Sequence, residues 1–118
     1  MGVSTDAILV YGIPLEECAI DHHRDGDPEE GPAWMAASGD EVDGIEIVSH
    51  CSDSHPMHIV AIVGTQTRAW RGHPVRVKAR TKPRGGAWDR KLRAFVKKHS
   101  LEAAPDAKPG WWLCSEWA

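Results

Sequence analysis

Several residues and runs that mark familiar protein classes are scarce or absent in this sequence. Its 118 residues include one Phe, one Tyr and three Cys. Cys18, Cys51 and Cys114 form neither an even set nor a C-x-x-C pair, which argues against a disulfide framework and favours reduced thiols. No apolar run is long enough to span a membrane, and the N-terminus lacks the basic, apolar and cleavage-site succession of a secretory signal. We therefore expect a cytoplasmic protein with no membrane partner.

Motifs of the common catalytic classes are also missing. The chain contains no G-x-x-x-x-G-K, G-x-G-x-x-G, G-x-S-x-G or H-E-x-x-H sequence, and so lacks the signatures of the frequent nucleotide-binding and hydrolase classes. Its composition, 42% apolar and 26% charged, is that of an ordinary globular protein. Its length suits a single domain over residues 1–118 that buries a core without disulfides.

Charge is distributed unevenly along the chain, although the formal net charge is only −3. Residues 1–60 hold thirteen of the seventeen carboxylates and one base, Arg24, whereas residues 61–118 hold the other thirteen bases. Such asymmetry can mark a binding face for nucleic acid or for a charged partner. The alternative is that the two halves fold against each other and neutralise, as neighbouring surface charges commonly do.

The apolar pattern predicts an α+β fold. Five segments are expected to form strands: 7–13, 44–50, 58–64, 75–80 and 111–117. Apolar residues recur at helical spacing over 87–101, with basic residues mainly on the other side, which predicts one principal amphipathic helix. We expect a mostly antiparallel sheet of about four or five strands with this helix packed on one face. Residues 14–43 are expected to form a long acidic loop with a short helix near 33–38.

Three histidines lie close together between two of the predicted strands. In a hairpin that places His50 opposite His58, the two rings would be near enough to share one ion, with His55 on the loop as a third ligand. Three protein ligands and an open position are what a catalytic zinc site requires. The spacing matches no established ligand motif, so the alternative is ordinary strand-end histidines held by hydrogen bonds. No cofactor is expected, with zinc as the alternative.

Six tryptophans are many for a chain of this length. Trp88 and one of the pair at 111 and 112 are expected in the core. Tryptophan dominates the energetics of many interfaces, and acidic residues in the 14–43 loop suit a basic partner surface. The candidate partner-binding residues are Trp34, Trp70, Trp117, Asp27, Glu29 and Glu30. The alternative is that the tryptophans cover a mixed sheet face.

Basic residues of the second half suggest a different partner. Arg76, Lys78 and Arg80 lie on one face of the predicted strand over 75–80, and Arg90 and Lys97 lie on the predicted helix. A row of basic side chains can follow a phosphate backbone. The negative net charge favours the alternative, in which these residues form a solvated face that pairs with the acidic half.

Parts of the sequence resemble a group of small bacteriophage and prophage proteins, often of actinobacteria, that have no assigned activity. The resemblance rests on Gly44-Ile45-Glu46-Ile47-Val48-Ser49-His50-Cys51 through Ala61, on Ala69-Trp70-Arg71-Gly72, and on Pro109-Gly110-Trp111-Trp112-Leu113-Cys114-Ser115. It covers most of residues 7–13 and 44–117. It implies a cytoplasmic accessory protein of a bacterial host, with a host or phage macromolecule as its partner.

Taken together, these features favour a non-enzymatic module that binds another protein. A metal-dependent enzyme, or a metal-stabilised domain, built on His50, His55 and His58 is the second hypothesis. Nucleic-acid binding through the basic half is the third.

Overall fold

The computed structural model describes residues 5–20, 31–52, 54–77 and 86–117. They form five strands and two helices in the order β1 (Thr5–Pro14), α1 (Pro32–Ser38), β2 (Ile45–Ser52), β3 (Pro56–Ile62), β4 (Thr67–Trp70), α2 (Ala87–Lys98) and β5 (Gly110–Trp117). The strands form one sheet with the order β3-β2-β5-β1-β4. The predicted α+β fold, with a mostly antiparallel sheet and one principal helix, is confirmed. Neither helix is long and apolar enough to cross a membrane, within the part of the chain that is described.

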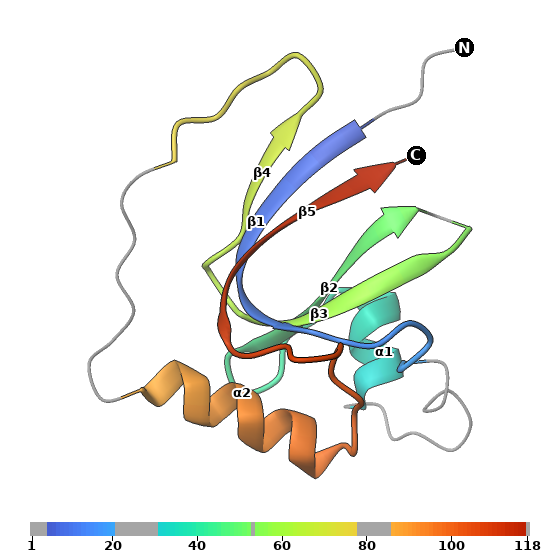
Figure 1. The fold of residues 1–118 in the computed structure, drawn as a ribbon, viewed down its shortest axis with the longest axis vertical. Coiled ribbons are helices and arrows are strands. Elements are labelled where there is room, and N and C mark those ends of the chain that lie inside the picture. Colours follow the sequence, from blue (N-terminus) through green and yellow to red (C-terminus); the bar gives the residue numbers. More distant parts are fainter. Residues whose placement is uncertain (1–4, 21–30, 53, 78–85, 118) are drawn as a thin grey trace.

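The sheet is curled, and the pairings between its strands form a closed circuit. Residues 5–12 of β1 pair with β5, while residues 12–14 of the same strand pair with β3. The circuit is completed by the β2–β3 hairpin and by a short parallel contact between the ends of β2 and β5. Strand β4 pairs with residues 6–9 of β1, so that this part of β1 lies between β4 and β5 (Figure 1).

Two residues make this closure possible. A Cβ atom on Gly12 would lie 2.2 Å from the carbonyl oxygen of Val60, so only glycine allows β1 and β3 to cross this closely. Tyr11 lies between the part of β1 that pairs with β4 and the part that pairs with β3. Its N–H donates to the hydroxyl of buried Thr65 at 3.1 Å. That hydroxyl in turn donates to the Ile62 carbonyl at 2.7 Å. The Thr65 side chain therefore replaces a ladder hydrogen bond where the chain turns from β3 into β4.

Each face of the curled sheet buries its own apolar cluster. Inside the curl, the cluster contains Ile8, Val10, Val48, Ile59 and Ala61, with Trp112 and Cys114 packed against it. The larger cluster lies between the opposite face and the two helices, and it includes Tyr11, Ile13, Met35, Ile45, Ile47, Val60, Ile62, Leu92 and Phe95. Because alternate residues of a strand point to opposite faces, neighbouring apolar residues such as Ile59 and Val60 contribute to different clusters.

Helix α2 is anchored to the sheet through Tyr11. The Tyr11 ring lies between Trp88 and Trp111, with ring centroids 5.1 and 5.2 Å away, and its hydroxyl donates to Asp89 Oδ1 at 2.5 Å. Asp89 lies in the first turn of the helix, and basic residues lie in its last turn, a distribution that suits the helix dipole. These contacts fix α2 across one end of the sheet.

The expected strand over 75–80 is wrong in its described part. Residues 74–77 form no strand, and Val75 and Val77 are both exposed. Alternation alone predicts a strand only if a neighbouring strand pairs with it, and here the edge of β1 is already occupied by residues 67–70. Residues 78–80 lie outside the described part of the chain.

The segment expected as a long acidic loop contributes more to the core than its composition indicates. The short helix predicted near 33–38 is confirmed as α1, which buries Pro32 and Met35. Upstream, Leu15, Ala19 and Ile20 are buried in the larger cluster. Leu15 also forms an isolated bridge with Ala103, which ties the start of this segment to the chain that follows α2.

Candidate protein-binding surface

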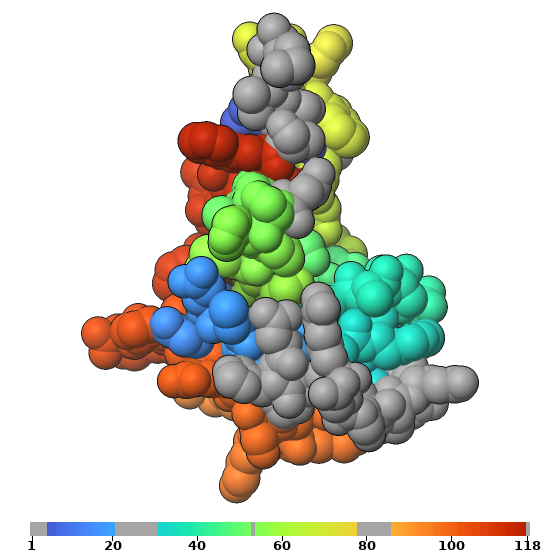
Figure 2. Space-filling model, turned by 90° about the vertical axis from the view of Figure 1, so that its right-hand side faces the viewer, coloured from blue at the N-terminus to red at the C-terminus, as the bar shows by residue number. Residues whose placement is uncertain are grey.

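The helices cover only part of one sheet face. The sheet beyond them, which we call the blade, consists of residues 5–10 of β1, β4, and residues 112–117 of β5. In Figure 1, α2 lies across the lower end of the sheet, and these strand ends extend away from it. In the space-filling view, the molecule is broad at the helices and narrower toward the ends of β4 and β5 (Figure 2). The blade therefore has an outer face that no described helix covers.

The outer face of the blade continues the face that carries Tyr11 and Trp111 beneath α2. Cross-strand pairs continue along it from Tyr11 and Trp111 to Leu9 and Leu113, and then to the tip of the blade. Its eight side chains are those of Thr5, Ala7, Leu9, Thr67, Ala69, Leu113, Ser115 and Trp117. None of these is charged, although charged residues make up 26% of the chain.

Two large side chains on this face are open to solvent. Leu113 is 73% exposed and Trp117 is 57% exposed. Single exposed apolar residues are normal on protein surfaces, but a contiguous uncharged face that contains several of them is typical of an interaction site. Isoleucine, valine and leucine side chains elsewhere in the sheet are buried. The outer face of the blade is therefore the part of the described sheet with the strongest character of an interface.

The inner face of the blade carries an ion-pair cluster that ties its three strands together. Arg68 Nη1 on β4 lies 2.9 Å from Asp6 Oδ2 on β1 and also donates to Glu116 Oε2 on β5. The Arg68 guanidinium lies over the Trp70 ring, 5.8 Å from its centroid. Asp6 is buried, and its Oδ1 atom accepts no hydrogen bond from the described residues. This cluster fixes the spacing of the strands that present the outer face.

Electrostatics around the cluster favour a structural role over a reactive one. Burial works to lower the pKa of Arg68, but hydrogen bonds to Glu116 and Asp6 outweigh it and raise the pKa above its ordinary value. Burial lowers the pKa of His50, against the opposing charge of Glu116, so its imidazole is uncharged at neutral pH. Burial raises the pKa of the Cys114 thiol, with Arg68 opposing the shift. A protonated thiol is a poor nucleophile.

The histidines predicted as metal ligands are not brought together as expected. The β2–β3 register pairs Ser49 with His58 and His50 with Met57, one residue away from the register that would place His50 opposite His58. A shift of one residue moves a side chain to the other face of the hairpin, so these two histidines lie on opposite faces. His55 is exposed on the connection, with Nδ1 3.3 Å from Ser54 Oγ. No three His, Cys, Asp or Glu side chains of the described residues are grouped so that they could hold a metal ion.

Tryptophans proposed for partner binding have different environments. Trp70 is 58% exposed on the inner face of the blade, and Trp117 is exposed on the outer face. Trp34 is half-buried on α1 and packs against the larger cluster. Trp88 and Trp111 also pack against that cluster, as expected of core residues. The acidic candidates Asp27, Glu29 and Glu30 lie outside the described residues.

Residues proposed for nucleic-acid binding do not share a described strand. Arg76 is exposed in a segment without strand structure, while Arg90 and Lys97 are on α2. Lys78 and Arg80 lie outside the described residues. The described part of the chain therefore lacks the alternating basic strand on which that hypothesis depended.

Sequence reasoning predicted two of the three strands of the blade but missed β4 and the ion-pair cluster. Asp6, Arg68 and Glu116 belong to three separate segments, and only their pairing shows that they meet. The available signal was the alternation in 111–117, where Trp111, Leu113, Ser115 and Trp117 share one face. Comparison of the chain with protein-family models, with curated proteins and with solved structures gives no match.

Proposed function

We propose that the protein is a binding module that docks another protein on the outer face of the blade. The observation that carries this proposal is the uncharged, uncovered continuation of a face whose other half is packed beneath α2. Interfaces are depleted in charge at their centre and enriched in tryptophan. Leu113 and Trp117 supply the apolar and aromatic contacts, and Thr5, Thr67 and Ser115 supply hydroxyl groups among them.

The rigidity of the blade supports this function. Each of residues 5–12 pairs with a residue of β5, and residues 6–9 also pair with β4. Arg68 links all three strands from the inner face. A surface whose backbone is already ordered loses less conformational freedom on binding, which increases affinity. The proposed partner is a protein with a complementary apolar patch.

A matched pair of variants tests this proposal. Leu113→Asp places a charge at the centre of the outer face, whereas Val77→Asp makes the same kind of change at an exposed aliphatic residue outside the blade. Both variants are expected to fold, because each replaced side chain is exposed. Proteins captured from a bacterial cell lysate by the wild-type chain are identified, and the affinity of each purified partner for the wild type and the two variants is then measured.

The expected result is that Leu113→Asp weakens binding at least about tenfold, as burial of an unpaired charge at an interface should, while Val77→Asp binds like the wild type. Equal affinity of the wild type and Leu113→Asp for every captured partner would contradict the proposal. Loss of binding by Val77→Asp alone would place the binding surface elsewhere.

A further inference from the structure

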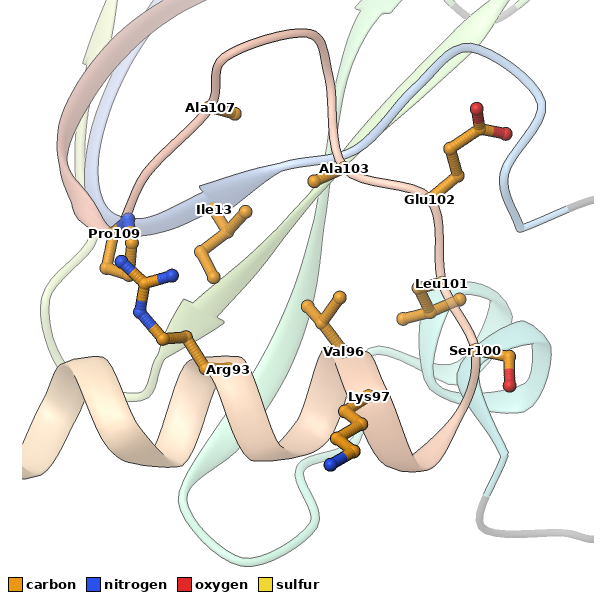
Figure 3. A pocket seen from close by; sticks show the side chains of 10 residues that line it. All are labelled: Ile13, Arg93, Val96, Lys97, Ser100, Leu101, Glu102, Ala103, Ala107 and Pro109. Atoms are coloured by element: carbon orange, nitrogen blue, oxygen red, sulfur yellow. The ribbon is translucent and has the colours of Figure 1, made fainter.

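A groove opens at the other end of the molecule, between α2 and the chain that follows it. Its volume is about 550 Å³, within the range of sites for small molecules. Its apolar lining comes from Ile13, Val96, Leu101, Ala103, Ala107 and Pro109. Figure 3 shows these side chains gathered between β1, the last turns of α2 and the segment over 100–109. None of them belongs to the outer face of the blade, so the groove is a separate feature.

The walls of the groove are held in place by backbone hydrogen bonds. At the end of α2, the Leu101 N–H donates to the Val96 carbonyl at 2.9 Å and the Ser100 N–H donates to the Lys97 carbonyl at 3.2 Å. This is the Schellman arrangement, and it turns Leu101 back into the core. The opposite wall is tied to the end of β1, where the Ala104 N–H donates to the Pro14 carbonyl at 2.9 Å. The groove is therefore formed before any ligand binds.

Positive charge lies along one side of the groove. Arg93 and Lys97 are four residues apart on α2, which places them on the same face of the helix, and both line the groove. Neither forms an ion pair with another described residue. Figure 3 shows the two side chains extending from α2 in different directions, Arg93 toward Pro109 and Lys97 away from it, so Arg93 is the cation on the β1 side of the groove. Figure 3 shows the Arg93 guanidinium beside Pro109 and Ile13, with Glu102 at the far end of the groove and directed away from it.

We propose that this groove binds a small amphipathic carboxylate, with its carboxylate on Arg93 and its apolar body over Val96, Leu101 and Ala103. The planar guanidinium can donate two parallel hydrogen bonds to a carboxylate, and Lys97 adds a second positive charge. The apolar lining favours a hydrocarbon chain over a polar molecule. Glu102, at the far end, disfavours a second anionic group there. The proposed ligand class is therefore a monocarboxylate with a single hydrocarbon chain.

Octanoate is a suitable probe, with octylamine as the ligand of equal length and opposite charge. Titration of the full chain is followed by backbone amide chemical shifts and by calorimetry. Saturable binding of octanoate is expected, with the largest shifts at residues 93–103, and octylamine is expected not to bind there. No saturable octanoate binding up to roughly 10 mM, a range of weak affinity, would overturn the proposal, as would equal binding of octylamine.

Variants separate the charged contact from the apolar one. Arg93→Gln is expected to weaken octanoate binding at least about tenfold, because a hydrogen-bonded charge pair is lost. Lys98→Gln serves as the control on the same helix, since Lys98 lines a different hollow, and it is expected to bind octanoate like the wild type. Ala107→Phe is expected to fill the groove and to reduce binding of the probe. Wild-type affinity in Arg93→Gln would overturn the assignment of the carboxylate to this residue.

Discussion

One sheet face has a covered half and an uncovered half, and the two differ in composition as well as in position. Beneath α2, the face carries Tyr11 and Ile13 in a cluster with the helix residues Leu92 and Phe95. Beyond α2, the same face carries Leu9, Ala7 and Leu113 with no described helix above them. The covered half is bulky and aromatic, whereas the uncovered half mixes small and hydroxyl side chains with Leu113 and Trp117.

The difference shows that the absence of charge identifies the candidate interface better than apolar content does. A solvated sheet face normally alternates with a buried one and collects charged residues. On the blade, the charged residues Asp6, Arg68 and Glu116 occur on the inner face, where they pair with each other. The outer face is left uncharged. This inversion of the usual pattern is consistent with an outer face that is covered only when a partner binds.

The largest contrast between the halves should appear when one side chain of each is truncated. Tyr11→Ala removes a buried ring, its contacts with Trp88 and Trp111, and its hydrogen bond to Asp89, and is expected to lower the free energy of unfolding by about 3–5 kcal/mol. Leu113→Ala is expected to change it by less than about 0.5 kcal/mol, because the side chain is exposed. Denaturant unfolding of the two variants measures both. A large loss in Leu113→Ala would show that the outer face contributes to the folded core.

One substitution can remove the ion pairs of the inner face of the blade without changing a side chain of the outer face. Arg68→Met leaves Asp6 and Glu116 without their shared cation, and is expected to lower the free energy of unfolding by about 1–3 kcal/mol, less than for a fully buried pair because Arg68 is partly exposed. Arg76→Met is the control, since Arg76 is exposed outside the blade. Similar unfolding curves for the two variants would mean that the ion-pair cluster does not stabilise the blade.

A smaller change in the free energy of unfolding is expected from a substitution at the end of α2, the helix that covers one half of the face. Ser100 closes α2 with φ at +51°, a left-handed conformation that glycine adopts without strain. Ser100→Gly is expected to raise the free energy of unfolding by about 0.5–1 kcal/mol. Thermal unfolding measures the change. A decrease in melting temperature would show that the Ser100 side chain contributes more than its backbone strain costs.

The smallest effect concerns the pH dependence of stability at His50 on β2, next to the blade. The pKa of His50 is lower in the folded protein than in the unfolded chain, because burial disfavours the charged imidazole. The unfolded chain therefore binds a proton first, so stability is complete above pH about 6.5 and decreases as the pH falls below that value. His50→Gln should lose less stability than the wild type between pH 7 and pH 5. Identical pH profiles of the two proteins would show that His50 titrates equally in both states.

The sequence was sufficient for the elements whose pattern is local. Periodicity predicts a helix over 87–101, which is observed over Ala87–Lys98, and a continuous apolar run predicts a strand over 7–13, which is observed over Thr5–Pro14. The predicted β2–β3 register differs from the observed one by one residue, because both faces of the hairpin carry buried apolar residues. Val48 and Ile59 are buried on one face, and Val60 and Ile62 are buried on the other. A strand that is buried on both sides has no polar face to fix its register.

The blade could not be predicted because its outer face is defined by long-range pairing. Leu9 and Leu113 are apolar residues in apolar strands, and sequence reasoning assigns such residues to the core. The part of the sheet face that is covered depends on the position of α2, which the contacts of Tyr11 fix. Strand β4 was missed for the same reason, since residues 67–70 become a strand only through the edge of β1.

The most direct test of docking on the outer face of the blade is a footprint of the complex with a captured partner. Side-chain oxidation by hydroxyl radicals is measured for the free protein and for the complex. Leu113 and Trp117 are expected to be protected by the partner, while Val77, which is also exposed in the free protein, is expected to be modified equally in both. Unchanged modification of Leu113 and Trp117 in the complex, with protection at another surface, would contradict docking on the outer face.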